Sequence, residues 1–275
     1  MVMTATLFDH LRVSLLKVAL TLRLTPGENV RELRLKIEQS GVDASLFVCT
    51  TPRSGSNLLD GLLASTGLVG EPAEDFGSVF ETHVPPVSCA DFGEYLLGRV
   101  GRARGGVFSM KLHGYQRDRL VHLLGLLRGG HRLSPSELIS ATFPDPHYVW
   151  LRRRDVVAQA VSWWKARQSG MWMGPRSGGR AEFDFDGIDA TVQRVRKEAN
   201  DWQRWFSTNG IEPLKVSYEQ LDGNPAAVVR EILAFVGVDT APDPTVNLRT
   251  VRQADAVNAE WIRRYREQAA EVARK

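Results

Sequence analysis

The sequence has few cysteines and no long uncharged apolar run. Its two cysteines, Cys49 and Cys89, form neither a CxxC pair nor a spaced Cys/His set, which excludes a disulfide-stapled or zinc-bound scaffold and favours a reduced, cytoplasmic protein. Charged side chains interrupt the apolar residues of segment 1–26, so no run reaches the roughly 18 residues of a membrane span, and the apolar core of a secretory signal is lacking. We therefore expect no stable membrane insertion. Packing of this segment on the protein body is favoured over a transient contact with a membrane surface.

An excess of charge of one sign is also lacking. The 35 Lys and Arg against 32 Asp and Glu give a formal charge of +3, so nucleic acid is not an expected partner, although a local basic pocket fits this balance. The composition, 43% hydrophobic and 24% charged, predicts a globular protein with a sizeable core. We predict a helical N-terminal extension over residues 1–44 and one main domain over residues 45–275.

Apolar, β-branched runs alternate with helical patterns along the main domain. Strands are expected at 46–51, 106–113, 147–153 and within 212–221, and each precedes a stretch with apolar residues at helical spacing. This alternation predicts an α/β fold, a parallel β-sheet flanked by helices, with the ligand site at the carboxyl ends of the strands. Residues 170–187, rich in Gly and mixed charge, are expected to form a long loop before the next helix.

The turn TTPRSGSN joins the first predicted strand to the first predicted helix of the main domain. Gly55 permits a tight turn, and the backbone N–H groups of residues 54–57 can converge on an anion at the start of the helix. Arg53 lies where a cation would face that anion. The order of residues differs from the GxxxxGK[ST] loop of nucleotide triphosphatases, and an ordinary turn with a surface arginine is the alternative. The predicted anion-binding residues are Pro52, Arg53, Ser54, Gly55, Ser56 and Asn57.

A second anion site is predicted from YVWLRRRDVVAQAVSWWKARQ. Arg153 and Arg154 lie at a strand end, and Ser162 follows about two helical turns later. A guanidinium fork and a hydroxyl at this spacing can close on one anion from two sides. Either arginine could be the partner of Ser162, and an incidental helix serine is the alternative.

These elements resemble sulfotransferases that use 3′-phosphoadenosine 5′-phosphosulfate (PAPS). The stretch LFVCTTPRSGSNLLDGLLASTGLVGEPAEDF is closely similar to the opening of the mycobacterial trehalose 2-sulfotransferase family, and the resemblance covers residues 46–265. It implies a P-loop-like sulfotransferase fold, with the 5′-phosphosulfate on turn 52–57 and the 3′-phosphate on Arg153 or Arg154 with Ser162. Asn57 replaces the usual Thr of the family but can still donate to a phosphate oxygen. Arg252 is a further phosphate candidate.

The resemblance also suggests roles on the acceptor side. Glu74 aligns with the carboxylate that deprotonates the sugar hydroxyl, with a surface carboxylate as the alternative. Lys111 resembles a position beside the active site, where an ammonium could stabilise the leaving phosphate or orient the acceptor. His113 and Trp172 are candidates for contacting the acceptor. The rivals of Glu74 for the base are Glu71, Asp75, His83 and His113.

The predicted activity is therefore the in-line transfer of the sulfuryl group of PAPS to a hydroxyl of a small molecule, giving a sulfate ester and 3′-phosphoadenosine 5′-phosphate (PAP). A saccharide, a glycolipid or a secondary metabolite fits as the acceptor, since residues 77–105 and 170–187 show no pattern that selects one. No metal is expected, and the resemblance implies a homodimer. An ATP- and Mg²⁺-dependent small-molecule kinase and a non-catalytic PAP-binding protein are the alternatives.

Overall fold

A four-stranded, all-parallel sheet with the order β2-β1-β3-β4 forms the centre of the computed structural model. The structure describes residues 29–77, 89–172, 179, 181–240 and 256–274. The strands are β1 (Ala44–Cys49), β2 (Val107–Leu112), β3 (Pro146–Arg152) and β4 (Leu214–Ser217). All four expected strands are confirmed, and the expected parallel α/β fold with them.

The strands read as continuous apolar runs because helices cover both faces of the sheet. All six residues of β1 are buried, and so are all six of β2. Successive side chains point to opposite faces. Phe47 and Cys49 therefore join one core cluster, whereas Leu46 and Val48 join another.

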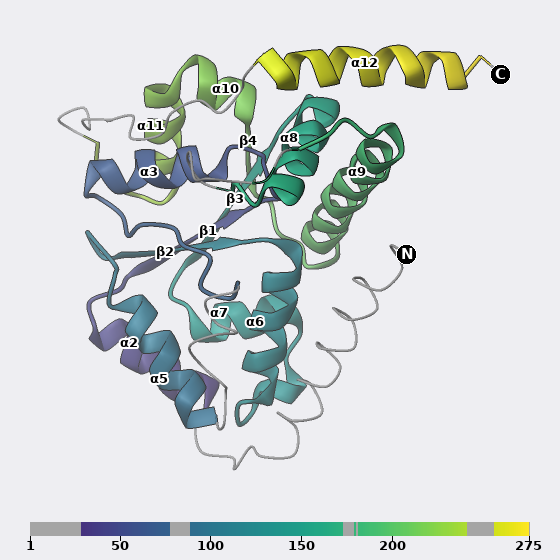
Figure 1. The fold of residues 1–275 in the computed structure, drawn as a ribbon. Helices are drawn as coiled ribbons and strands as arrows, with labels where there is room; N and C mark the ends of the chain where they lie inside the picture. Colours follow the sequence, from purple (N-terminus) through teal and green to yellow (C-terminus); the bar gives the residue numbers. More distant parts are fainter. Residues whose placement is uncertain (1–28, 78–88, 173–178, 180, 241–255, 275) are drawn as a thin grey trace.

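Two helical layers enclose the sheet, as Figure 1 shows. The larger layer contains α2 (Val30–Gln39), α5 (Cys89–Val100), α6 (Gly114–Leu126), the short 3-10 turn η1 (Gly130–Arg132), α7 (Pro135–Thr142) and α9 (Phe185–Thr208). The opposite layer contains α3 (Ser56–Thr66), α10 (Tyr218–Gly223) and α11 (Pro225–Phe235). A third apolar cluster joins α9 to α8 (Val156–Ser169) and α12 (Ala256–Val272).

The ends of some elements differ from the sequence-based expectation. The fourth strand stops at Ser217, because the Ser217 side chain accepts from the backbone N–H of Gln220 and begins α10. The helix expected after 170–187 begins at Phe185, where Asp184 caps it. In both places a short polar cap residue determines the boundary.

The described end of the predicted N-terminal extension packs on the main domain. Val30, Leu33 and Ile37 of α2 are buried in the same cluster as Phe47 of β1. The capping box of Asn29 and Glu32 begins this helix. The boundary between residues 44 and 45 stays a prediction.

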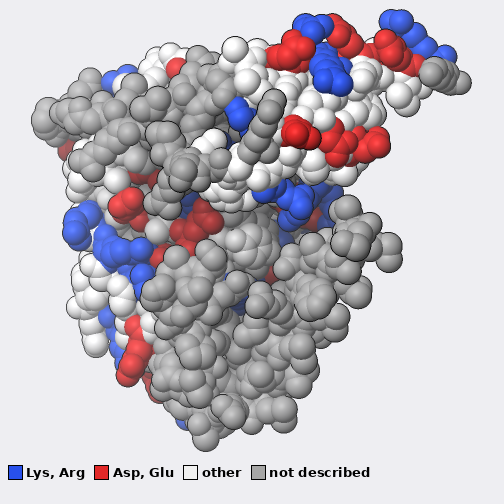
Figure 2. All heavy atoms as spheres, in the orientation of Figure 1, with Lys and Arg blue, Asp and Glu red and all other residues white. Residues whose placement is uncertain are grey.

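The described surface carries charges of both signs. Figure 2 shows basic and acidic side chains intermixed, most visibly along α12. On that helix Arg263 pairs with Glu260 and with Glu267. Within the described ranges, no helix is long and apolar enough to cross a membrane.

Phe47→Ala tests the larger core cluster. The Phe47 ring contacts Phe143 at 5.2 Å and Tyr148 at 5.4 Å between centroids, so its removal leaves a cavity that rigid neighbours cannot fill. We expect a loss of about 3–5 kcal/mol in the free energy of unfolding, measured by denaturant titration. Leu35→Ala, at a side chain of α2 that is 55% exposed, is the control and should change little. A loss below about 1 kcal/mol for Phe47→Ala would contradict this packing.

Candidate active site

Several of the polar residues singled out in the sequence, and Tyr218 with them, lie where the parallel strands end. The turn 52–57 follows β1, Lys111 is the penultimate residue of β2, and Arg153 follows β3. Tyr218 follows β4. Because the strands are parallel, these positions share one edge of the sheet.

The turn after β1 depends on a glycine. Gly55 has φ +94° and forms the N-cap of α3, a left-handed conformation that L side chains rarely adopt. A Cβ at this position would lie 2.5 Å from Cδ2 of Tyr218, so the ring also requires the absence of a side chain. Arg53 has φ +64°, which is uncommon for a residue other than glycine and places strain in this turn.

Buried hydrogen bonds fix the rest of the turn. The hydroxyl groups of Thr50 and Ser54 bond to each other across it. From α8, the Gln159 amide donates to Thr51 Oγ1 at 2.8 Å and to the Pro52 carbonyl at 2.7 Å. The turn is therefore held in one shape by a helix that begins about 100 residues later in the chain.

Two arginines and a serine meet beside the turn. Arg53 Nε donates to Ser162 Oγ at 3.0 Å, and Arg53 Nη1 donates to the Trp172 carbonyl at 2.7 Å. The Arg153 guanidinium lies over the Tyr218 ring at 4.7 Å, and its buried Nε has no hydrogen-bond partner among the described residues. Burial, and next the charge of Arg153, lower the pKa of Arg53. Cations brought together in this way favour an anion between them.

Arg154 faces a different partner. Its side chain is 70% exposed and lies 3.4 Å from Glu219. The same carboxylate accepts from the backbone N–H groups of Arg154 and Asp155. Of the two candidate arginines, the structure therefore brings Arg153 to Tyr218 and Arg53 beside the turn, and it directs Arg154 toward α10.

A second charged centre surrounds Glu74, in the segment after α3. One carboxylate oxygen, Oε1, lies 3.2 Å from Lys111 Nζ and 3.4 Å from His113 Nε2. The other, Oε2, accepts from Gln116 Nε2 at 3.1 Å. The Glu74 side chain is 39% exposed, so one side of the carboxylate is open to a ligand.

The neighbours of Glu74 favour its ionised form. Burial alone would raise the pKa of Glu74, but the hydrogen bond and charge of His113, followed by those of Lys111, outweigh it and hold that pKa well below its usual range. The carboxylate is therefore ionised, and it is a weak base as long as Lys111 and His113 favour its charged form.

Lys111 links the two centres. Its ammonium donates to Asn57 Oδ1 at 2.8 Å and to Asp60 Oδ2 at 2.6 Å, both from the first two turns of α3. Burial raises the pKa of Asp60 to about 7, against the opposing charge of Lys111. Sequence reasoning missed Asp60, although its place in the apolar stretch LLDGLL and its i,i+3 spacing from Asn57 are visible signals.

The remaining candidate residues contribute less to these two charged centres or lie outside the described residues. Glu71 is exposed, and Asp75 is bound by Arg102 Nη2 at 2.6 Å, so neither faces Lys111 as Glu74 does. Trp172 is 45% exposed and meets the site through its carbonyl. Sequence reasoning also missed Gln116 and Gln159, which bond to Glu74 and to the turn. The candidates His83 and Arg252 lie outside the described residues.

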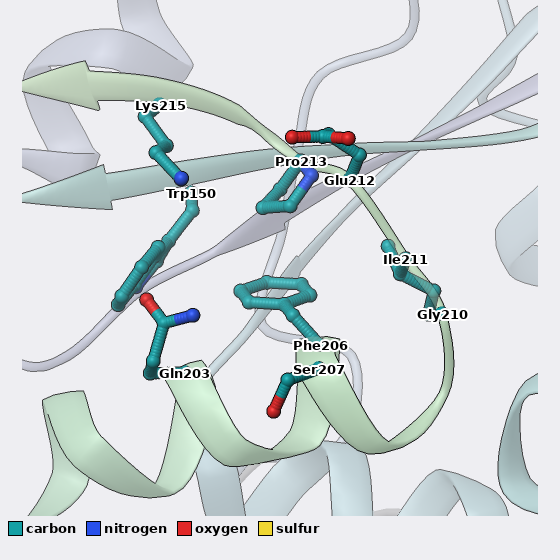
Figure 3. Close-up of a pocket in the computed structure, with 9 residues that line it drawn as sticks. All are labelled: Trp150, Gln203, Phe206, Ser207, Gly210, Ile211, Glu212, Pro213 and Lys215. Carbon is teal, nitrogen blue, oxygen red and sulfur yellow. The ribbon is translucent and has the colours of Figure 1, made fainter.

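A surface pocket lies elsewhere on the sheet. Figure 3 shows it between α9, which contributes Phe206, and the strands β3 and β4, which contribute Trp150 and Lys215. Its volume is about 300 Å³, and a neighbouring pocket of about 410 Å³ shares Ile211 and Glu212 with it. None of the predicted site residues lines either pocket. In the part of the chain that the structure describes, no three His, Cys, Asp or Glu side chains are grouped as metal ligands.

Comparisons of the sequence with known proteins agree on one enzyme class. The model of the Stf0 sulphotransferase family matches residues 45–268. Trehalose 2-sulfotransferase of Mycolicibacterium smegmatis is 32% identical, with 81% of this chain and 94% of that protein covered. The protein of the same name from Mycobacterium tuberculosis is 30% identical with the same coverage. Among solved structures, the sulfotransferase domain of the Synechococcus PCC 7002 olefin synthase superposes with a TM-score of 0.45 and 14% identity, covering 88% of this chain and 97% of that one.

Gly55→Ala tests the shape of the turn. Gly67→Ala is the matched control, since Gly67 has φ +67° at the other end of α3 and a Cβ added there would meet no atom within 4 Å. Both variants should lose about 1–2 kcal/mol of stability from the left-handed backbone. Only Gly55→Ala, which also displaces Tyr218, should weaken PAP binding, by about tenfold or more in calorimetry. Equal PAP affinities of the two variants would contradict the role of this turn.

Glu74→Gln tests the electrostatics of the second centre. A depressed pKa contributes stability that is present above the unfolded value of 4.5 and is lost as the pH falls toward the folded value. The difference in the free energy of unfolding between wild type and Glu74→Gln should therefore shrink between about pH 6 and about pH 3.5. Denaturant titration at each pH measures it, with Glu71→Gln as the control. A difference that grows on acidification would show that the pKa of Glu74 is not depressed.

Proposed function

The chain belongs to the Stf0 sulphotransferase family and is a sulfotransferase, and we propose that it moves the sulfuryl group of PAPS onto a hydroxyl of a saccharide. The pairing of Arg53 and Arg153 beside a helix start without a side-chain cap carries this proposal. Burial and the charge of Arg153 lower the pKa of Arg53, and the Nε of Arg153 has no partner among the described residues. Two such cations fit a ligand with more than one anionic group.

The turn 52–57 suits the 5′-phosphosulfate. The N-cap residue Gly55 offers α3 no side chain, and a Cβ there would crowd the turn, so backbone can approach the anion closely. Lys111 has only donors, so the amide of Asn57 must turn its oxygen toward Lys111. This orientation leaves the Asn57 NH₂ group to donate to a phosphate oxygen, the task of Thr in the family.

The 3′-phosphate fits between Arg153 and Ser162. The Arg153 Nε is buried without a partner among the described residues, and Ser162 Oγ accepts from Arg53, which leaves its own hydrogen to donate. We therefore assign the 3′-phosphate to Arg153 rather than Arg154. This site distinguishes PAP from ADP, which carries no 3′-phosphate.

The proposed mechanism uses Glu74 as the base. Glu74 accepts the hydroxyl proton of the acceptor as the acceptor oxygen forms its bond to sulfur in line with the leaving oxygen. The S–O bond to the 5′-phosphate breaks with its electron pair on that oxygen. Arg53 and the backbone N–H groups of the turn stabilise this charge, and Lys111 lies between the turn and Glu74. When bound, PAPS supplies the sulfuryl group and leaves as PAP.

The acceptor side is proposed from the open side of Glu74 and from Trp172. Trp172 is 45% exposed as a residue, and its ring provides an aromatic surface on which a sugar ring can stack. His113 lies against Glu74 and can bond a sugar hydroxyl. The matched relatives are trehalose 2-sulfotransferases, which makes trehalose the first acceptor to test.

Three further properties complete the proposal. We propose a cytoplasmic protein, because the two cysteines form no motif and Cys49 is buried and free. We also propose a homodimer, as the family resemblance implies, and transfer that needs no metal. The catalytic domain would span residues 45–275 with an N-terminal extension before it.

Calorimetric titration with PAP and with ADP, in EDTA and then in Mg²⁺, tests the nucleotide site. We expect a metal-independent preference for PAP of about tenfold or more, or roughly 1.4 kcal/mol. Arg153→Met should abolish this preference, because it removes the arginine that we assign to the 3′-phosphate. Arg154→Met, a matched change at the next position, should retain it.

The other outcomes identify the alternatives. Equal affinities for PAP and ADP in the wild type, or binding that requires Mg²⁺, would overturn the sulfotransferase site and favour the kinase. A strong PAP preference without transfer of labelled sulfate from PAPS to trehalose or another saccharide would favour the non-catalytic PAP-binding protein.

A further inference from the structure

The ammonium of Lys111 lies among three protein oxygens, two of which accept a hydrogen bond from it and one of which forms an ion pair with it. Asn57 Oδ1 lies at 2.8 Å, Asp60 Oδ2 at 2.6 Å and Glu74 Oε1 at 3.2 Å. A lysine ammonium carries three donors and no acceptor, so all three oxygens can be served by it at once. Lys111 therefore forms a fixed bridge between the first turns of α3 and the proposed base.

Asp60 occupies a position where a charged side chain lowers the stability of the fold. It is 7% exposed on a helix face that otherwise buries leucines, and its Oδ1 is buried without a hydrogen-bond partner among the described residues. A buried carboxylate with one unsatisfied oxygen costs stability that an apolar residue would not cost. The ion pair with Lys111, at 2.6 Å, is the closest contact that favours its charged form.

We propose that Asp60 is a positioning residue for sulfuryl transfer, which holds Lys111 between the nucleotide turn and Glu74 and offsets its positive charge so that Glu74 can act as a base. This inference rests on the proposed function. It assigns to Asp60 a role that acts through Lys111 and requires no contact between Asp60 and either substrate.

The charges around Asp60 support this role. Lys111 from β2, His113 from the residue after β2 and Glu74 from the segment after α3 all act on it. Without Asp60, two potential cations would face Glu74 with no second carboxylate to oppose them. The carboxylate of Glu74 would then be a weaker base, while the nucleotide turn would become more positive.

Asp60→Asn separates this role from a merely structural one. The asparagine keeps the shape and can still accept from Lys111, but it removes the negative charge. We expect PAP to bind about threefold more tightly in calorimetry, because the site gains net positive charge. In contrast, kcat should fall by about tenfold, because Glu74 is less basic, and the decline of kcat below about pH 7 that protonation of Asp60 causes in the wild type should be lost. Structural damage would weaken both binding and turnover.

Two further variants complete the experiment. Glu267→Gln makes the same change in net charge on the surface of α12 and should alter neither PAP affinity nor kcat. Asp60→Ser, smaller and uncharged, should give the same opposed changes as Asp60→Asn and replaces it if the asparagine variant does not fold.

The outcomes distinguish this inference from the function on which it rests. Wild-type protein that fails to transfer sulfate from PAPS overturns the proposed function and this inference with it. Wild-type transfer together with an unchanged kcat and pH profile in Asp60→Asn overturns this inference alone. So does a parallel loss of PAP affinity and kcat with a lower melting temperature, which would show that Asp60 only supports the fold.

Discussion

The central position of β1 is the constraint on which the site depends. β1 pairs in parallel with β2 on one side and β3 on the other, and Cys49 lies beside Leu112 and Trp150 in the register. This register delivers the anion turn, the lysine of β2 and the arginine after β3 to one edge at the same height. A register slip of one residue in either pair would turn those side chains to the opposite face. The two apolar clusters that lock the sheet therefore also align the charges.

This edge of the sheet contains two electrostatic centres that differ in their balance of positive and negative charge. Around Arg53 and Arg153 positive charge is in excess, which suits a multiply charged nucleotide. Around Glu74 two carboxylates, those of Glu74 and Asp60, lie against Lys111, so negative groups balance the positive one. Helix α3 serves both, because its N-terminus faces the first centre and its second turn reaches the second through Lys111. One short helix thus connects the two centres through Lys111.

The fold and the shape of the turn 52–57 could be predicted from the sequence because their signals are local. A strand buried on both faces reads as an apolar run, and a turn that needs a left-handed residue displays Gly55. The choice between Arg153 and Arg154 could not be predicted, since neighbouring residues at a strand end point in different directions and Glu219 lies 65 positions from Arg154. Asp60 was missed for the same reason, because its proposed role depends on a contact with Lys111, which lies 51 positions away in the sequence.

The hydrogen bond from Arg53 to the Trp172 carbonyl has a consequence for the evolution of acceptor choice. We propose the stretch that begins at Trp172 as part of the acceptor side, and the Trp172 carbonyl accepts from Arg53 of the turn that we propose for the donor. If both proposals hold, an acceptor that shifts Trp172 changes the affinity for the donor, and by linkage the donor changes the affinity for the acceptor by the same factor. Exchanging this stretch between relatives would then change the affinity for the donor as well as the choice of acceptor. A further substitution near α8 would be needed to restore the affinity for the donor.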